Sequence, residues 1–188
     1  MRKVIVEEWL SLDGFAAEKN EELNFFPDSA TDKYSDYDQL EFLKSVDTIL
    51  LGRVTYELFV DFWPTATTDK EIIADKLNSL SKIVFSNSLS TAPWGKWQPA
   101  TIMNGDAATN IRELKNEKGK DMVLWGSLTL AQSLIKENLV DEYHIRICPT
   151  AIGNGRKFFP VADKFFNLRL THFKKYDSGT VLLQYQPK

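Results

Sequence analysis

Residues 48–57, TILLGRVTYE, place Gly52 between an apolar run typical of a buried strand and a run typical of a helix. Residues 122–129, MVLWGSLT, repeat this arrangement around Gly126. At such a strand-to-helix turn the backbone N–H groups can meet a phosphate, and a glycine lets the anion approach closely. Either glycine alone is also consistent with an ordinary turn that binds no ligand. Two of them, separated by alternating strand and helix patterns, predict one extended anionic ligand held between neighbouring strand ends.

Length and composition limit the class of protein. The chain has 188 residues, 43% of them hydrophobic and 12% aromatic, and we expect residues 1–188 to form a single domain. Its net charge of −3, with 23 basic and 26 acidic residues interspersed, gives no basic stripe for nucleic acid. No apolar run approaches the roughly 18 residues of a membrane span, and acidic residues come too early for a signal peptide. We therefore expect a cytoplasmic protein that binds neither nucleic acid nor membrane.

Metal and thiol sites are not expected. Cys148 is the only cysteine, which excludes a disulfide within the chain and a thiolate cluster. His144 and His172 are too few for a histidine-rich metal site. Both are predicted to lie in strands, and Cys148 is predicted to be an unreactive thiol within a strand. Glu7 and Glu8 fall on opposite faces of a strand, so they are poor candidates for a pair of glycosidase carboxylates.

Periodicity predicts the order of the elements. Strands are predicted at residues 3–9, 48–51, 82–85, 100–103, 122–125 and 140–148, and helices at 36–45, 55–60, 69–80, 106–117 and 128–137. Residues 165–174 and 180–186 predict a C-terminal hairpin. Residues 93–97 are predicted to be a surface excursion and residues 152–156 a loop. This order predicts an α/β fold with a mixed, mainly parallel sheet and helices on both faces.

Several polar side chains accompany the glycine turns. Arg53 and Thr55 add a charge and a hydroxyl beside the first one. Ser86 and Asn87 follow another strand, so they lie at the same sheet edge, where they could reach a ribose or a second phosphate. Ser127 is predicted to cap the helix that follows it.

Aromatic side chains could form the walls of a dry pocket for hydride transfer. They are Trp9, Phe25, Phe26, Tyr56, Phe59 and Trp63. Such spacings are also typical of a core. Asp13 follows a strand and precedes a glycine, which makes it the candidate for relaying a proton or positioning a ligand, although an Asp-Gly pair is also typical of a turn.

The motifs, taken in order, resemble the dihydrofolate reductase superfamily. They are SLDGFAA at 11–17, LGRVTYE at 51–57, FSN at 85–87, LWGS at 124–127 and PTAIGNG at 149–155. Within that superfamily the chain is most similar to the RibD C-terminal domain, the reductase domain of riboflavin biosynthesis, and to its small stand-alone bacterial relatives. The resemblance implies a dihydrofolate reductase-like three-layer fold with a C-terminal antiparallel hairpin.

The same resemblance implies an NADPH-dependent reductase. The nicotinamide would lie near Trp9, Asp13 and Ala16, and the adenosine end near Ser86 and Asn87. The residues that would face the cofactor phosphates are Gly52, Arg53 and Thr55 on one side and Gly126, Ser127, Leu128 and Thr129 on the other.

Two positions depart from the family pattern. Ser127 stands where a second glycine is usual. Gln39 stands where folate-reducing relatives have a carboxylate facing the pterin, and an amide cannot stabilise a protonated pterin by charge. We therefore expect another small ring or carbonyl substrate, in a pocket lined by Gln39, Tyr56, Phe59 and Trp63.

The resemblance leaves two functions open. The first is reduction of a small heterocyclic or carbonyl compound, with a pteridine or the 5-amino-6-(5-phosphoribosylamino)uracil of riboflavin biosynthesis as candidate substrates. The second is a non-catalytic protein that binds a nucleotide or small ligand on the same scaffold. A homodimer is expected because the riboflavin branch of the superfamily tends to dimerise.

Overall fold

An eight-stranded sheet forms the centre of the computed structural model, which describes residues 1–20, 22–27, 33–161 and 165–188. Its strand order is β5-β4-β3-β6-β1-β7-β10-β9. The strands are β1 (Val4–Leu10), β3 (Val46–Gly52), β4 (Ser81–Phe85), β5 (Thr101–Met103), β6 (Asp121–Trp125), β7 (Glu142–Ile147), β9 (Leu168–Lys175) and β10 (Val181–Pro187). Neighbours from β5 to β7 run parallel, whereas β10 is antiparallel to both β7 and β9. The predicted mixed sheet and C-terminal hairpin are confirmed.

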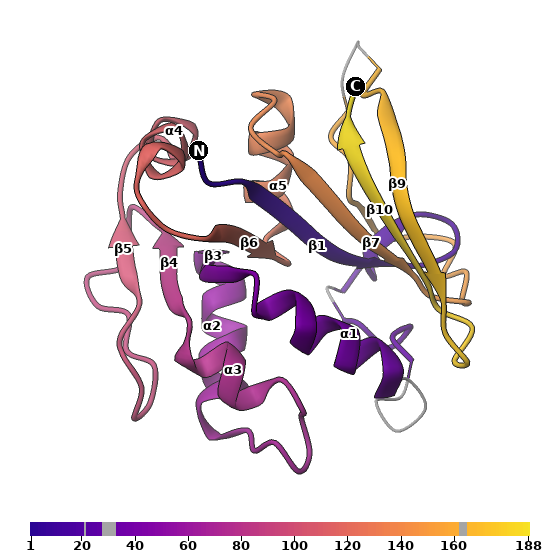
Figure 1. Cartoon of the computed structure of the whole chain (residues 1–188), viewed down its shortest axis with the longest axis horizontal. Helices are drawn as coiled ribbons and strands as arrows, with labels where there is room; N and C mark the ends of the chain where they lie inside the picture. The colour runs from indigo at the N-terminus through magenta and orange to yellow at the C-terminus, as the bar shows by residue number, and fades with distance from the viewer. Residues whose placement is uncertain (21, 28–32, 162–164) are drawn as a thin grey trace.

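Helices cover both faces of this sheet. Helices α1 (Lys33–Leu43), α2 (Arg53–Phe62) and α3 (Ala74–Ser79) lie on one face, and α4 (Ala107–Asn116) and α5 (Leu128–Lys136) on the other (Figure 1). Alternation along β1 explains the two cores, because Val4 and Val6 pack towards α4 and α5 while Ile5 packs towards α1 to α3. The predicted three-layer α/β fold is confirmed. In the part of the chain that the structure describes, no helix is long and apolar enough to cross a membrane.

The helix predicted over residues 69–80 is wrong in its first half. Only α3, its last part, is helical, and a 3₁₀ turn (Trp63–Thr65) follows α2. The N–H groups of Lys70 and Glu71 donate to the Thr67 carbonyl, at 3.0 and 2.8 Å, and so close a separate turn. The apolar periodicity of residues 69–80 therefore indicates which side chains pack on the core, and the first part of the segment forms turns instead of a helix.

The predicted surface excursion at residues 93–97 holds for the exposed Pro93, Gly95 and Lys96 and is wrong for Trp94. Trp94 is fully buried in the core beneath α2 and α3. Its indole N–H donates to the side-chain oxygen of Asn78 at 2.7 Å, and the Asn78 amide donates to the Trp63 carbonyl at 2.7 Å. A single large aromatic ring with its polar atom satisfied anchors this connection inside the protein.

A second, two-stranded sheet was not expected. Strands β2 (Phe15–Ala17) and β8 (Arg156–Lys157) pair antiparallel, so the predicted loop at residues 152–156 ends in a strand. The chain passes so close to β2 that a Cβ on Gly155 would stand 2.2 Å from the Ala17 carbonyl oxygen. This pairing joins distant segments, and two residues are too short to leave a periodic signal.

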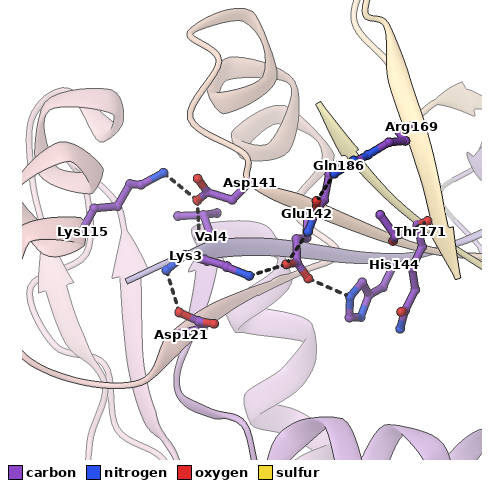
Figure 2. Close-up of polar contacts among 11 residues, drawn as sticks. Lys3, Val4, Lys115, Asp121, Asp141, Glu142, His144, Arg169, Thr171 and Gln186 are labelled. Atoms are coloured by element: carbon purple, nitrogen blue, oxygen red, sulfur yellow. Dashed lines mark hydrogen bonds and ion pairs between the residues drawn. The ribbon is translucent and has the colours of Figure 1, made fainter. Parts of the chain in front are cut away.

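The amino ends of the parallel strands carry a group of paired charges, which we call the amino-end network (Figure 2). The Lys3 backbone N–H donates to Asp121 at 2.7 Å, and the Lys3 ammonium donates to Glu142 at 2.6 Å. Lys115 donates to Asp141 at 2.6 Å. Asp141 also accepts the Val4 N–H at 2.7 Å, so all three carboxylates hold the start of β1 against its neighbours.

Candidate functional site

The two glycine turns lie side by side at the opposite, carboxyl end of the sheet. Strands β3 and β6 are parallel neighbours, so Gly52 and Gly126 follow adjacent strand ends, where α2 and α5 begin. Gly126 has a φ of +55°, and a Cβ on it would stand 3.1 Å from the Thr55 methyl carbon. The turns are thus packed against each other, as a shared ligand site requires.

Ser127 connects the two turns through hydrogen bonds. Its hydroxyl accepts the Gly52 N–H at 2.8 Å, and its own N–H donates to the Thr55 hydroxyl at 2.9 Å. It occupies the N-cap position of α5 in a left-handed conformation, with φ 53°, and makes no side-chain cap bond. The prediction that its side chain caps the helix is wrong, because the hydroxyl is turned towards the neighbouring turn instead.

The other predicted cofactor residues surround these turns. The Arg53 guanidinium pairs with Glu57 one helical turn on, at 2.8 Å, and is exposed. Thr129 lies on the first turn of α5, after the largely buried Leu128. After β4, the Asn87 side-chain oxygen accepts the Gly105 N–H at 2.6 Å. These contacts leave the set spread along one edge of the sheet.

The Ser86 hydroxyl is engaged within its own turn. It accepts the N–H groups of Ser88 and Leu89 at 3.2 and 3.1 Å. The Ser86 carbonyl also accepts the Asn104 amide at 2.6 Å. Hydrogen bonds therefore hold the β4 end and the β5 end together.

A cavity of about 280 Å³ opens beside the glycine turns. It lies at the carboxyl end of β1 and β6, between these strands and the segments on the α1 to α3 face. It is lined by Glu7, Glu8, Trp9, Leu23, Phe26, Pro27, Asp36, Gln39, Phe59, Trp63, Glu71, Ile72, Ile73, Trp125 and Gly126. The structure thus brings together Trp9, Gln39, Phe59, Trp63 and Gly126 from the predicted set, and apolar surface predominates in the lining.

Four residues predicted to form the pocket or to lie near the nicotinamide are outside this cavity: Phe25, which is buried, and Tyr56, Ala16 and Asp13. Tyr56 is buried in the core, and its hydroxyl donates to the Pro93 carbonyl at 2.7 Å. Ala16 is buried in β2 on the other side of β1. The exposed Asp13 carboxylate accepts the N–H groups of Ile152 and Gly153, at 3.2 and 2.7 Å.

Hydrogen bonds lower the pKa of Asp13. The strongest cause is the Ser11 hydroxyl, which donates to the carboxylate at 2.7 Å, and the N–H groups of Ile152 and Gly153 act in the same direction. The contacts show that Asp13 ties the loop after β1 to the loop after β7. A catalytic role for Asp13 stays a prediction.

A buried ion pair lies behind one wall of the cavity. The Arg146 guanidinium, on β7, pairs with Glu7, and its Nε donates to the Ser35 hydroxyl at 2.9 Å. The guanidinium also stacks on Trp9, 4.7 Å from the ring centroid. Gln39 donates its amide to the other Glu7 oxygen at 3.3 Å. Gln39 on α1 thus contacts a carboxylate on β1, Glu7, whose charge is already neutralised by Arg146.

Glu8 and Trp125 each carry a buried polar atom without a partner. The Glu8 Oε2 atom and the Trp125 indole nitrogen have no hydrogen-bond partner among the described residues. Burial raises the pKa of Glu8 to about 8, so the group is largely protonated at neutral pH. Unpaired buried polar atoms are uncommon outside functional sites.

Sequence reasoning missed these residues. It considered Glu7 and Glu8 only as a glycosidase pair and placed Arg146 on a strand without a function. Two consecutive carboxylates after the apolar Val4 to Val6 run were the available signal, because acids seldom occupy a central buried strand without a partner.

Comparison with known proteins adds independent information. The profile of the RibD C-terminal domain family matches residues 2–182. The uncharacterized protein YyaP of Bacillus subtilis (strain 168) is 29% identical over 187 residues, which cover 98% of this chain and 94% of that protein. The chain and YyaP therefore match over nearly their whole lengths.

Two solved structures share the fold. A putative riboflavin biosynthesis protein from Shewanella sp. PV-4 has a TM-score of 0.77 at 22% identity, covering 99% of both chains. A dihydrofolate reductase from Enterococcus faecalis, complexed with NADP(H) and RAB-propyl, has a TM-score of 0.64 at 14% identity, covering 99% of this chain and 96% of that one. The predicted dihydrofolate reductase-like fold is confirmed.

Proposed function

Because the chain belongs to the RibD C-terminal domain family, we propose that it is an NADPH-dependent reductase that acts on a small heterocyclic or carbonyl compound. One observation carries this proposal. Gly126, in the second glycine turn, and the aromatic side chain of Trp9 line the same cavity. A cofactor that follows the turns therefore leads directly to a cavity in which an acceptor ring would fit.

The residues around the turns fit a dinucleotide. Helices α2 and α5 both begin there, and the first N–H groups of a helix favour an anion. Gly126 lets the two turns pack closely, because a Cβ there would stand 3.1 Å from the Thr55 methyl carbon. Arg53 and Thr129 stand on the first turns of the two helices, with Ser86 and Asn87 along the edge for the adenosine end.

The cofactor, when bound, supplies a hydride, and the protein has to supply the surroundings and a proton. Trp9, Phe59 and Trp63 exclude water from the acceptor. As the acceptor carbon takes the hydride, its heteroatom takes one proton, which leaves a neutral reduced product.

NADPH titration followed by oxidation assays tests this function. We expect micromolar NADPH affinity and loss of absorbance at 340 nm with at least one member of a panel of pterins, aminopyrimidines and quinones. No NADPH binding would contradict the reductase function.

One observation favours the non-catalytic alternative. The Ser127 hydroxyl already accepts the Gly52 N–H that a cofactor phosphate would use. NADPH binding without oxidation across the panel would support a binding protein. A Ser127→Gly variant that binds NADPH more tightly than the natural chain would show that the hydroxyl competes with the phosphate.

We also propose a homodimer. Val161 and Phe165 are each 93% exposed, and Phe165 lines an apolar groove together with Leu183 and Tyr185 of β10. Apolar surface of this kind favours association. Sedimentation velocity at micromolar concentration should give twice the monomer mass, and a monomer would contradict the proposal.

A further inference from the structure

The cavity walls are built for a flat, apolar ring. Trp9 stacks on Phe26 with ring centroids 5.8 Å apart, and Phe59 packs against both Trp63 and Trp125. At about 280 Å³, the space has the size of one or two fused rings.

The charged side chains of the cavity all have the same sign. Among the described lining residues, four are acidic, Glu7, Glu8, Asp36 and Glu71, and none is lysine, arginine or histidine. Arg146 neutralises Glu7, and the Glu8 side chain lies on the opposite face of β1, which leaves Asp36 and Glu71 as the acidic side chains of the cavity. Glu71 is half-buried. An anionic substituent would therefore meet carboxyl groups and would lose its hydration without gaining a counter-ion.

Arg146, whose guanidinium contacts the lining residues Glu7 and Trp9, is not available to a ligand. Arg146 is 1% exposed, its charge is paired with the fully buried Glu7, and the Trp9 ring covers one face of its guanidinium. A ligand phosphate could reach Arg146 only by separating a buried ion pair, which is strongly unfavourable. The pair therefore holds Trp9 in place and contributes no positive charge to the cavity.

We propose that this cavity selects an uncharged or cationic planar ring compound and rejects ligands that carry a phosphate, sulfonate or carboxylate group. That the selected compound is a substrate rests on the proposed reductase function. The class of ligand that the cavity accepts rests on the cavity alone. It favours an unsubstituted pteridine or a similar neutral ring over a phosphoribosylated aminopyrimidine.

Calorimetric titration of the chain without cofactor tests the ligand class with two matched pairs. The first is pterin and pterin-6-carboxylate, and the second is 1,4-naphthoquinone and its 2-sulfonate. We expect the neutral member of each pair to bind at least about tenfold more tightly, which corresponds to about 1.4 kcal/mol. Equal or tighter binding of the anionic members overturns the inference, and so does the absence of binding by both neutral members at millimolar concentration.

Charge reversal at the cavity gives a matched variant. Glu71→Lys should narrow the difference within each pair several-fold, while the affinity of the neutral members changes little. Glu113→Lys makes the same change in net charge on the exposed surface of α4 and should leave the ratio unchanged. An unchanged ratio in Glu71→Lys overturns the assignment of selectivity to the cavity acids.

The outcomes separate this inference from the proposed function. Tight binding of the neutral rings without NADPH oxidation contradicts the reductase function and leaves the ligand class standing. NADPH oxidation with the anionic members preferred has the opposite meaning, because it supports a reductase and overturns the ligand class.

Discussion

The carboxylates at the two ends of the parallel strands differ in burial and in hydrogen-bond partners. At the amino end, Asp121, Asp141 and Glu142 lie near the surface and each accepts a hydrogen bond from a lysine or a backbone N–H (Figure 2). At the carboxyl end, Glu7 is fully buried with a single cation, and Glu8 is buried with one oxygen unpartnered. The paired carboxylates of the amino end are typical of a structural role. The buried, incompletely paired carboxyl groups of the carboxyl end are typical of a functional site.

The difference also appears in the direction of the pKa shifts. Contacts with His144, then Lys3 and Gln186, lower the pKa of Glu142 to about 2 against the opposing effect of burial. Burial raises the pKa of Glu8 to about 8. Glu142 at the amino end is thus held in its charged form and Glu8 at the carboxyl end in its neutral form, which gives these two acids opposite responses to pH.

The largest expected effect comes from removing the cation of the carboxyl end. Arg146→Met leaves the Glu7 carboxylate buried without a counter-ion, and we expect a loss of about 3–5 kcal/mol in the free energy of unfolding. Urea denaturation at pH 7 measures it. The double variant Glu7→Gln/Arg146→Met should recover most of the loss, because no unpaired charge remains. A single variant as stable as the natural chain would show that Glu7 is not held as an ion.

The second effect concerns Glu8 and the pH dependence of stability. The folded protein keeps a proton on Glu8 that the unfolded chain releases above its ordinary pKa of 4.5. Stability should therefore decrease as pH rises from 4.5 to about 8, by at most about 1.4 kcal/mol per pH unit. Glu8→Gln cannot ionise, so its stability should vary less across that window. Equal slopes in urea titrations of the two proteins would contradict a protonated Glu8.

The arrangement of the strands could be predicted from the sequence, and most of the site's polar contacts could not. Gly52 and Gly126 follow apolar runs, and parallel strands bring such ends together, so their proximity follows from local patterns. Pairing of Glu7 with Arg146 joins residues 139 positions apart, and no periodicity records it. Buried Trp94 was missed for a similar reason, since its partner Asn78 lies in another element.

The third effect, at the amino end, has the opposite sign in pH. The folded-state pKa of Glu142 lies below its ordinary value of 4.5, so its contribution is present above pH 4.5 and is lost as pH falls towards 2. Glu142→Gln should lower stability at pH 7 by about 1 kcal/mol, because the pair with Lys3 is partly exposed, and should match the natural chain near pH 2. A deficit that persists unchanged at low pH would point to packing instead of charge.

The smallest expected effect on folding belongs to Asp13, which lies at the carboxyl end but outside the cavity. Its carboxylate holds the Ile152 and Gly153 N–H groups, so Asp13→Ala should loosen the two loops that flank the proposed nicotinamide position. We expect turnover to fall several-fold, with little change in NADPH affinity or in the unfolding midpoint. Asp13→Asn keeps an acceptor oxygen for one of these bonds and should retain more turnover than the alanine variant. If both variants turn over as fast as the natural chain, the loop contact does not serve the reaction, and the functional contrast between the two ends is confined to the cavity itself.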